Sequence, residues 1–488
     1  MRAAFARERE EVMKVLLIAP ASGKWHQIGR APLFGGRVFR FSLLSLLQVA
    51  AETPAGVEVE IVDEQVQDVP LDDDFDLVGI TCMTAAAPRA YELARSFRSR
   101  GVPVVLGGMH PTLMPEEALA HADAVCAGDA EGVWGRIVED ARAGALAGLY
   151  RAAPRELADL GRPPRHLLQS RHYGTVQAVQ ATRGCPNRCA FCSVSAFHGG
   201  RFRCRPVEQV VAEIAGLPDR FFVFVDDDLI ADRAYAGDLF RALRPLRKRW
   251  ISQATLDITD DPELVRLAAD AGCIGLFVGI ETFSEANLRS VDKRFNKVRE
   301  YREKIARLHA HGIGVEAGIV FGFERDDAAV FARTLRLLDE LQIDMVQVSI
   351  LTPLPGTPFH QSSAARIIDR DWSHYDFHHV VFEPKRMSVE ELQAGHDWVT
   401  REFYRPWRIA RRLARMALRP RGWRAIPYAA AINLAYYGRT VRWNIRGWDP
   451  AARGGNESWH HLAVIPANAG IQSSDCIQRR SGPRLSPG

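Results

Sequence analysis

The sequence predicts an α/β protein in which two parallel-sheet domains follow one another and a helical extension comes after them. Compact apolar strands alternate with amphipathic helices in residues 13–145, and a second series of the same kind occupies residues 173–380. Parallel strands that are buried on both faces are continuous apolar runs, and crossover helices cover those faces. We therefore expect an N-terminal doubly wound parallel sheet, then a partial (β/α)6 barrel, then helices.

The first domain is expected to begin at Met13, directly before the apolar strand Val15–Ile18, so residues 1–12 are interpreted as an upstream extension. Its other elements alternate along the chain: strands at Val57–Val62, Leu77–Thr81, Val102–Leu106 and Ala124–Ala127, and a helix at Pro88–Arg100. Ligands of such sheets bind beyond the carboxyl ends of the strands.

A linker rich in arginine and proline, residues 146–172, is expected to separate this domain from the second series. The strands expected in the second series are Val176–Ala181, Phe221–Val225, Ser252–Leu256, Ile274–Gly279, Gly314–Phe321 and Met345–Leu351. Such a run of βα units fits a parallel partial barrel, whose active site lies at the carboxyl ends of its strands.

The end of the chain is helical and basic. Residues 385–450 are interpreted as a helical extension, in which Arg401–Arg424 carries nine arginines with Trp407 and Trp423 among them. Two interpretations stay open: the basic helix rests on an anionic membrane surface, or it packs on the barrel with a solvated basic face. Residues 451–488 are polar and irregular, and we expect a disordered tail there.

Composition excludes some classes of function. Of the 488 residues 25% are charged, and a formal net charge of +4 is too balanced for the concentrated basic face of a nucleic-acid-binding protein. The charged N-terminus lacks the apolar region of a signal peptide, and no stretch reaches the ~18 apolar residues that a membrane span needs. We therefore expect a cytoplasmic protein with no nucleic-acid partner, associated with a membrane only if the basic helix rests on one.

Three cysteines within eight positions form the most informative motif of the chain. Cys185, Cys189 and Cys192 follow a predicted strand with the spacing C-x3-C-x2-C, and clustered cysteines in a long chain indicate metal binding rather than disulfides. A [4Fe–4S] cluster normally takes four thiolates, so three leave one iron open to an outside ligand. The alternatives are a zinc site completed by His198 or Cys204, and a closed four-thiolate cluster for electron transfer.

This segment, Ala181-Thr-Arg-Gly-Cys185-Pro-Asn-Arg-Cys189-Ala-Phe-Cys192, resembles the cluster loop of the radical S-adenosylmethionine superfamily. The resemblance implies that these cysteines are the catalytic metal ligands of a [4Fe–4S] cluster whose open iron chelates S-adenosylmethionine. It also implies reductive cleavage to methionine and a 5′-deoxyadenosyl radical, with electrons from a donor such as flavodoxin or ferredoxin. Phe191, directly before the last cysteine, would then pack near the adenine.

Positions after later strands resemble cosubstrate-binding elements of the same superfamily. Asp226 and Asp227, in the triplet Asp226-Asp-Asp228, stand where the superfamily has Gly-Gly-Glu, and they are expected to accept the cosubstrate's ammonium group; the alternative is a solvated helix cap. Arg203 and Arg205 are candidates for binding the methionine carboxylate; the alternative is that they are ordinary surface arginines. Glu281 and Thr282 are candidates for binding the ribose or the carboxylate, and Gly318 and Gly322 would let the backbone pass close to the adenine.

The loops of the first domain resemble those of a cobalamin-binding domain. The sequence has neither the G-x-G-x-x-G fingerprint of dinucleotide-binding sheets nor a P-loop lysine. The resemblance implies instead that small and hydroxyl-bearing residues after successive strands accommodate the corrin tail, namely Thr81, Thr84, Gly107, Gly108 and Gly128. The D-x-H-x-x-G signature is not intact, because Lys24 stands where the aspartate would be, so we interpret His26 as a loop histidine rather than a cobalt ligand.

Together these resemblances imply a cobalamin-dependent radical enzyme that methylates an unactivated carbon of a large or lipid-like substrate. The substrate class is suggested by the C-terminal extension, which resembles that of lipid-modifying members of the class. One alternative is a radical cyclase, or another rearranging or carbon–carbon bond-forming enzyme without methyl transfer. Another is a non-enzymatic cobalamin or redox sensor, which would need full cysteine ligation of its cluster.

Overall fold

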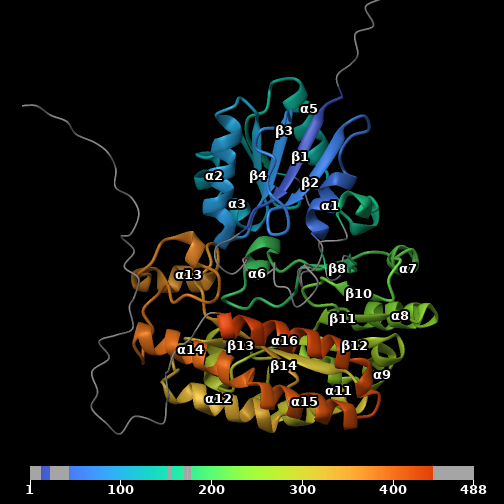
Figure 1. The fold of residues 1–488 in the computed structure, drawn as a ribbon, viewed down its shortest axis with the longest axis vertical. Helices are drawn as coiled ribbons and strands as arrows, with labels where there is room; N and C mark the ends of the chain where they lie inside the picture. Colours follow the sequence, from blue (N-terminus) through green and yellow to red (C-terminus); the bar gives the residue numbers. More distant parts are fainter. Residues whose placement is uncertain (1–11, 22–42, 152–154, 170–172, 174–176, 443–488) are drawn as a thin grey trace, which may run out of the picture. The chain divides into compact units, whose positions relative to one another are not determined.

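The computed structural model describes residues 12–21, 43–151, 155–169, 173 and 177–442, which belong to one compact unit. Two parallel sheets with flanking helices and a set of C-terminal helices make up these residues, which confirms the predicted α/β class (Figure 1). Lys24, His26, the N-terminal extension up to residue 11 and the tail at residues 451–488 lie outside the described residues.

In the first sheet the strand order is β2-β1-β3-β4-β5-β6, and every neighbouring pair is parallel. The strands are β1 (Lys14–Ala19), β2 (Glu58–Asp63), β3 (Leu77–Thr81), β4 (Val104–Gly107), β5 (Ala124–Ala127) and β6 (Gly148–Arg151). The order reverses direction at β1, as in doubly wound sheets. Because β6 pairs with β5, the sheet extends to Arg151, past the boundary expected at residue 145.

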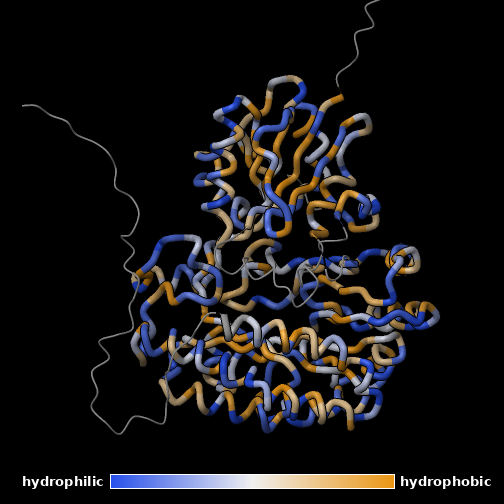
Figure 2. Tube along the Cα trace, in the orientation of Figure 1, coloured by the Kyte–Doolittle hydropathy of each residue, from blue (hydrophilic) through white to orange (hydrophobic). Residues whose placement is uncertain are grey.

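Alternate residues of the central strand β1 belong to two separate cores. Leu16 and Ile18 pack with α2 (Ala87–Arg98), and Val15 and Leu17 pack with α1 (Leu44–Ala51) and α5 (Trp134–Arg142). The central strands of this domain are accordingly hydrophobic along most of their length (Figure 2). Both faces are therefore covered, which leaves the carboxyl edge of the sheet, with its loops and the short helices α3 (Met109–Leu113) and α4 (Pro115–Leu119), for ligands.

The second sheet is parallel and open, with the order β14-β13-β12-β11-β10-β7, as a partial barrel requires. Its strands are β7 (Ala178–Val179), β10 (Phe221–Phe224), β11 (Arg249–Gln253), β12 (Cys273–Glu281), β13 (Gly314–Phe321) and β14 (Met345–Ile350). A small antiparallel hairpin, β8 (Thr182–Arg183) and β9 (Arg203–Cys204), brackets the cysteine segment and α6 (Ser193–His198).

Helices of the βα units cover one face of this sheet. They are α7 (Val207–Ala215), α8 (Arg233–Leu243), α9 (Pro262–Asp270), α10 (Glu285–Ser290), α11 (Tyr301–Ala310) and α12 (Ala329–Glu340). Phe222 and Phe224 point into the core beneath them. Val223, between those two, lies on the opposite face and packs against the C-terminal helix. We call that opposite face the inner face.

The C-terminal helices follow a short helix, α13 (Pro358–Ser363), and comprise α14 (Val389–Phe403), α15 (Pro406–Leu418) and α16 (Ile426–Arg442). Ser388 and Glu391 form a capping box at the start of α14, which satisfies amides that would otherwise lack acceptors. Ala429 and Ile432 of α16 pack on the inner face against Val223 and Ile251. Within the described residues, every helix falls short of the length or apolarity needed to cross a membrane.

Candidate active site

The cysteine segment runs from β8 to α6 and is held at its middle by two backbone hydrogen bonds. The amide of Ala190 donates to the carbonyl of Val291 (3.0 Å), and the carbonyl of Ala190 accepts from the amide of Phe359 (2.9 Å). Val291 follows α10 and Phe359 lies in α13, so segments far apart in sequence fix this loop. The amide of Cys192 donates to the carbonyl of Cys189 (3.0 Å), which closes a turn between two of the cysteines.

The donor set of this loop fits an iron–sulfur cluster. Cys185, Cys189 and Cys192 are free thiols; burial raises the pKa of Cys185 to about 11 and that of Cys189 to about 12, although Lys293 lowers the latter. Such thiols give up their protons when a metal binds. Across the described ranges, no three His, Cys, Asp or Glu side chains, these cysteines included, converge on a single-ion site. Three thiols on one loop are the ligand set of a [4Fe–4S] cluster in which one iron is left to an outside ligand.

Gly184 directly precedes Cys185, and its backbone lies against the backbone of Arg201. Its φ is +85°, and a Cβ at this position would overlap the carbonyl oxygen of Arg201. We expect Gly184→Ala to destabilise the loop by more than ~1 kcal/mol and to lower sharply the iron and sulfide content after anaerobic reconstitution. Gly199→Ala is the matched control, because Gly199 also has a positive φ (+63°) but open space at its Cβ position. Equal iron content in the two variants would contradict this role.

The first two carboxylates of the acidic triplet fasten the entry to the loop. Asp226 is fully buried and accepts hydrogen bonds from the amide of Ala181 (3.1 Å) and from both the amide and the hydroxyl of Thr182. Burial raises the pKa of Asp226 to about 7, against the effect of these donors. Asp227 accepts from the amide of Gly184 (3.0 Å). Their expected contact with the cosubstrate's ammonium group stays a prediction.

Asp228, the third member of the triplet, is a candidate that the sequence did not single out. Its side chain is 3% exposed, and its Oδ1 atom is buried without a hydrogen-bond partner among the described residues. Burial and the nearby Asp257 raise its pKa to about 6, and its charge raises the pKa of Cys185. A buried carboxylate oxygen that lacks a donor and lies near a cysteine of the loop fits an ammonium group.

β12 ends in a strained residue and a buried ion pair. Glu281 has a φ of +62°, which is rare for a residue with a Cβ, and the pairing of β12 with β13 shifts register there. Its carboxylate binds the ammonium of Lys293 at 2.5 Å, and each side chain is 10% exposed. Burial lowers the pKa of Lys293, but Glu281 and Cys189 raise it further, so the lysine is charged beside the loop. Thr282 is buried and accepts from the amide of Ser284 (3.3 Å).

The glycines and the aromatic residue assigned to the adenine occupy different surroundings. Phe191 is half-buried against the core of the barrel. Gly318 makes room for the ring of Phe277, whose Cζ would lie 2.9 Å from an added Cβ. Gly322 has a φ of +102° and faces Leu392 of α14, 3.0 Å from an added Cβ. All three assignments to the adenine stay predictions, and the packing explains the glycines without it.

Two arginines beside the cysteine segment bind acidic residues of the first domain. Arg183 and Arg203 are cross-strand partners in the β8–β9 hairpin. Arg183 pairs with Asp129 (3.3 Å) and Glu131 (2.9 Å), and Arg203 pairs with Asp129 (2.6 Å). Each of the four side chains is at most 15% exposed. We call this network the inter-domain clamp. Arg203, which we expected to bind the methionine carboxylate, is paired with Asp129 in this network.

The other arginine assigned to that carboxylate is part of the barrel. Arg205 is 9% exposed, donates to the carbonyl of Gln180 (2.9 Å) and pairs with Glu213 (2.7 Å). Glu213 also binds Arg165, so the three charges form one buried network beneath β7. The predicted role of Arg205 at the cosubstrate stays a prediction.

The candidate cobalamin loops lie at the carboxyl ends of β3, β4 and β5. Gly108 has a φ of +93°, and its missing side chain allows the Thr81 hydroxyl to lie 2.5 Å from where a Cβ would be. Gly107 ends β4, and its carbonyl accepts from the amide of Cys82 (3.0 Å). Gly128 also has a φ of +93°, with nothing within 4 Å of its Cβ position. Backbone that turns sharply and faces open space at a strand end fits a bulky ligand.

A buried polar network also connects the first domain to the segment after the barrel. Thr84 is buried, and its hydroxyl lies 3.4 Å from Nδ1 of His110, which is fully buried. Nε2 of His110 lies 3.3 Å from Glu117, whose carboxylate also accepts from the indole N–H of Trp372 (2.9 Å). Trp372 begins the short helix η11 (Trp372–His374), which follows β14 in the chain. Thr84 therefore contributes to this second inter-domain contact.

Comparison with known proteins adds evidence from sequence families. The family described as the radical SAM superfamily matches residues 179–338, and the family described as the B12 binding domain matches residues 34–138. The chain is 30% identical over 383 residues to the bacteriochlorophyllide d C-12(1)-methyltransferase of Chlorobaculum tepidum, covering 76% of this chain and 84% of that protein. This chain belongs to the cobalamin-binding radical S-adenosylmethionine family. As a member, this radical S-adenosylmethionine enzyme uses a [4Fe–4S] cluster, S-adenosylmethionine and cobalamin.

Two further relatives of this radical S-adenosylmethionine enzyme agree in sequence or in fold. The bacteriochlorophyllide d C-8(2)-methyltransferase of the same organism is 28% identical over 359 residues, covering 68% of this chain and 79% of that protein. The methyltransferase TsrM from Kitasatospora setae, solved with cobalamin and a [4Fe–4S] cluster, superimposes with a TM-score of 0.56 at 17% identity and covers 72% of this chain and 74% of its own. That likeness supports the fold.

Proposed function

We propose that this enzyme transfers a methyl group to an unactivated carbon of a large, mostly apolar ring system of the tetrapyrrole kind. The observation that carries the proposal is the inter-domain clamp, since it ties the cysteine hairpin directly to the loop after β5 of the cobalamin-binding-like domain. A methyltransferase of this class needs its two cofactors close to one substrate, and a buried ion-pair network between their loops suits that need.

The chain's own residues hold and orient the reactants. When bound, the cluster supplies the electron that cleaves S-adenosylmethionine, and cobalamin supplies the methyl group. Cys185, Cys189 and Cys192 would ligate three irons, and the unpartnered oxygen of Asp228 would accept the ammonium group of the cosubstrate. Thr81, Gly107, Gly108 and Gly128 would accommodate the corrin tail at the strand ends of the first sheet. An electron donor such as flavodoxin or ferredoxin would reduce the cluster.

The substrate class is inferred from the relatives. Two bacteriochlorophyllide methyltransferases are matched over most of their own length. Toward its carboxyl end, the inner face of the partial barrel carries the ring of Phe277 packed over Gly318. A flat, apolar ring is compatible with such a surface. This supports a tetrapyrrole within the broader expectation of a large or lipid-like substrate.

The test uses the full chain, reconstituted anaerobically with iron, sulfide and cobalamin, then given dithionite, S-adenosylmethionine and bacteriochlorophyllide d. We expect 5′-deoxyadenosine and a product heavier by one CH2 unit in the mass spectrum. Cys189→Ala should abolish both, whereas Cys273→Ala, which removes a buried cysteine outside the loop, should retain both. Deoxyadenosine with a product of altered structure but no added CH2 unit would favour the cyclase alternative over methyl transfer. Wild-type levels of deoxyadenosine from Cys189→Ala would contradict the radical reaction itself.

A further inference from the structure

The helix α15 carries a stripe of large apolar and cationic side chains on the face opposite its buried face. Its inward face carries Ile409, Arg412 and Met416, all buried. Trp407 and Leu418 lie on the opposite side of the helix, three turns apart, and are 52% and 88% exposed. Residues separated by three, four, seven or eleven positions share a helical face, so Arg411 lies between them. Trp407 and Leu418 therefore lie on either side of Arg411 along the outward face of α15.

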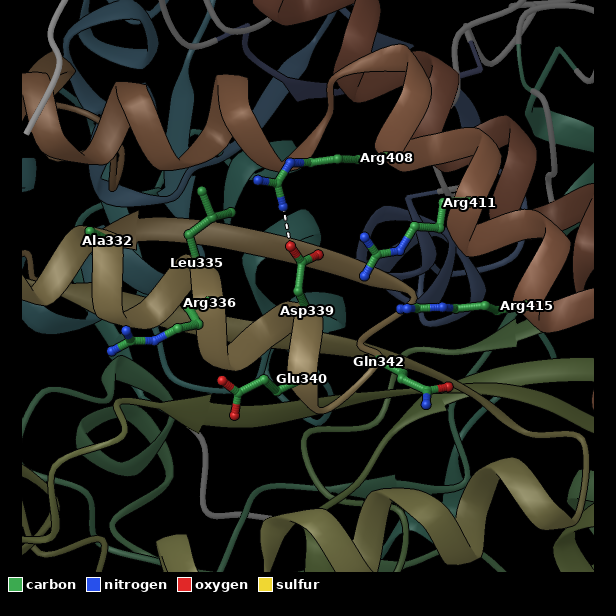
Figure 3. A pocket seen from close by; sticks show the side chains of 9 residues that line it. All are labelled: Ala332, Leu335, Arg336, Asp339, Glu340, Gln342, Arg408, Arg411 and Arg415. Atoms are coloured by element: carbon green, nitrogen blue, oxygen red, sulfur yellow. Dashed lines mark hydrogen bonds and ion pairs between the residues drawn. The ribbon is translucent and has the colours of Figure 1, made fainter. Parts of the chain in front are cut away.

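Beside this stripe lies a groove between α12 and α15 with a volume of about 500 Å3. Figure 3 shows that the guanidinium groups of Arg408, Arg411 and Arg415 extend from α15 toward α12 across this groove. Arg408 pairs with Asp339 of α12, and its guanidinium also lies over the Trp407 ring, 4.7 Å from the centroid. Arg408 thus connects the arginines of the groove to the exposed Trp407.

The groove carries positive charge that nothing in the described structure neutralises. Its two carboxylates already have arginine partners: Asp339 binds Arg408, and Glu340 binds Arg302 at 3.5 Å. By contrast, the side chains of Arg411 and Arg415 make no hydrogen bond or ion pair with any described residue. Two arginine side chains one helical turn apart, with ten donors between them, form a site for phosphate oxygens.

We propose that α15 lies on an anionic lipid surface, with Trp407 and Leu418 at the level of the headgroups and lipid phosphates bound by Arg411 and Arg415. Charge complementarity favours this occupant, because cations surrounded by exposed tryptophan and leucine match a layer whose anionic groups cover apolar chains. An acidic protein would satisfy the arginines but would leave the 88% exposed Leu418 without an apolar layer to enter. This contact is independent of the proposed reaction.

The test is flotation of the anaerobically purified full chain with lipid vesicles. We expect co-flotation with vesicles of phosphatidylcholine containing phosphatidylglycerol, and little with phosphatidylcholine alone. Replacing both free arginines (Arg411→Gln with Arg415→Gln) should weaken partition roughly tenfold or more, since each basic residue near an anionic surface contributes about 1 kcal/mol. Trp407→Ala with Leu418→Ser should weaken it comparably while leaving the dependence on phosphatidylglycerol in place.

The matched control removes two exposed arginines from elsewhere, Arg241→Gln with Arg299→Gln, and should partition like the wild type. Circular dichroism of each variant reports whether it is folded, which separates lost binding from lost structure. Equal binding to both kinds of vesicle, or the same loss in the control as in the groove variant, would overturn the proposal. So would binding of inorganic phosphate in the groove without any vesicle binding. Because neither cluster nor substrate is needed, failure here leaves the proposed reaction untouched.

Discussion

Asp228→Asn should raise the KM for S-adenosylmethionine roughly ten- to hundredfold, because a hydrogen bond to a charged group in a buried site contributes about 1.5–3 kcal/mol. The asparagine keeps the shape of the side chain but removes the charge that would pair with the cosubstrate's ammonium group. The measurement is the rate of 5′-deoxyadenosine formation against S-adenosylmethionine concentration, with iron content determined on the same samples. Iron content and kcat should change much less than KM.

The control for this experiment is the neighbouring substitution Asp227→Asn. The Asp227 carboxylate accepts a hydrogen bond from the amide of Gly184 at 3.0 Å, and an asparagine oxygen can accept that bond as well. We therefore expect Asp227→Asn to have nearly the wild-type KM. The reverse result, a raised KM in Asp227→Asn alone, would restore the assignment made from sequence and remove Asp228 from the site.

Arg183→Gln should destabilise the folded protein by about 3 kcal/mol, because it leaves Asp129 and Glu131 buried with one arginine between them. Unfolding by urea, followed by fluorescence, measures this change. The same variant should also form less methylated product per 5′-deoxyadenosine, since the loop after β5 would no longer be fixed to the cysteine hairpin. This ratio distinguishes a positioning role from a loss of folded protein, which would lower both products equally.

Adding Glu131→Gln to Arg183→Gln should restore part of the lost stability, because it removes one of the unpaired buried charges. Arg142→Gln is the matched control: Arg142 pairs with Glu139 on the surface, and both side chains are about half exposed. Its loss should cost no more than ~0.5 kcal/mol. If Arg183→Gln behaved like this control in both measurements, the clamp would have no part in joining the domains.

Much of the fold could be predicted because its determinants are local. Runs such as Val15–Ile18 and Leu77–Ile80 contain no polar side chain, as strands buried on both faces require. The cysteine segment could likewise be recognised, because its spacing lies within one loop. The pair Arg183 and Glu131 could not, since 52 residues separate them and their contact depends on how two domains meet.

The choice within the acidic triplet could not be made from the sequence. Alternation along a strand gives Asp226 and Asp228 the same side as Phe222 and Phe224, but β10 ends at Phe224 and the triplet lies beyond it. Asp226 and Asp227 accept hydrogen bonds from backbone amides of the segment that leads into the cysteine loop, and Asp228 keeps an oxygen without a described partner, so the difference arises from contacts distant in sequence. The strained backbone of Glu281 and its pairing with Lys293 could not be predicted either, because neither composition nor periodicity encodes a positive φ at a strand end.

The packing of α16 on the inner face has a consequence for how this chain is made. Val223 and Ile251 are synthesised nearly two hundred residues before Ala429 and Ile432, which cover them. Until α16 has left the ribosome, the apolar patch of Val223, Ile251, Ile274 and Met345 on the inner face is exposed, and such surfaces bind one another when nascent chains meet. A chain shortened before Ile426 would keep this patch exposed permanently, so the addition of α16 is the step that completes the core of the second domain.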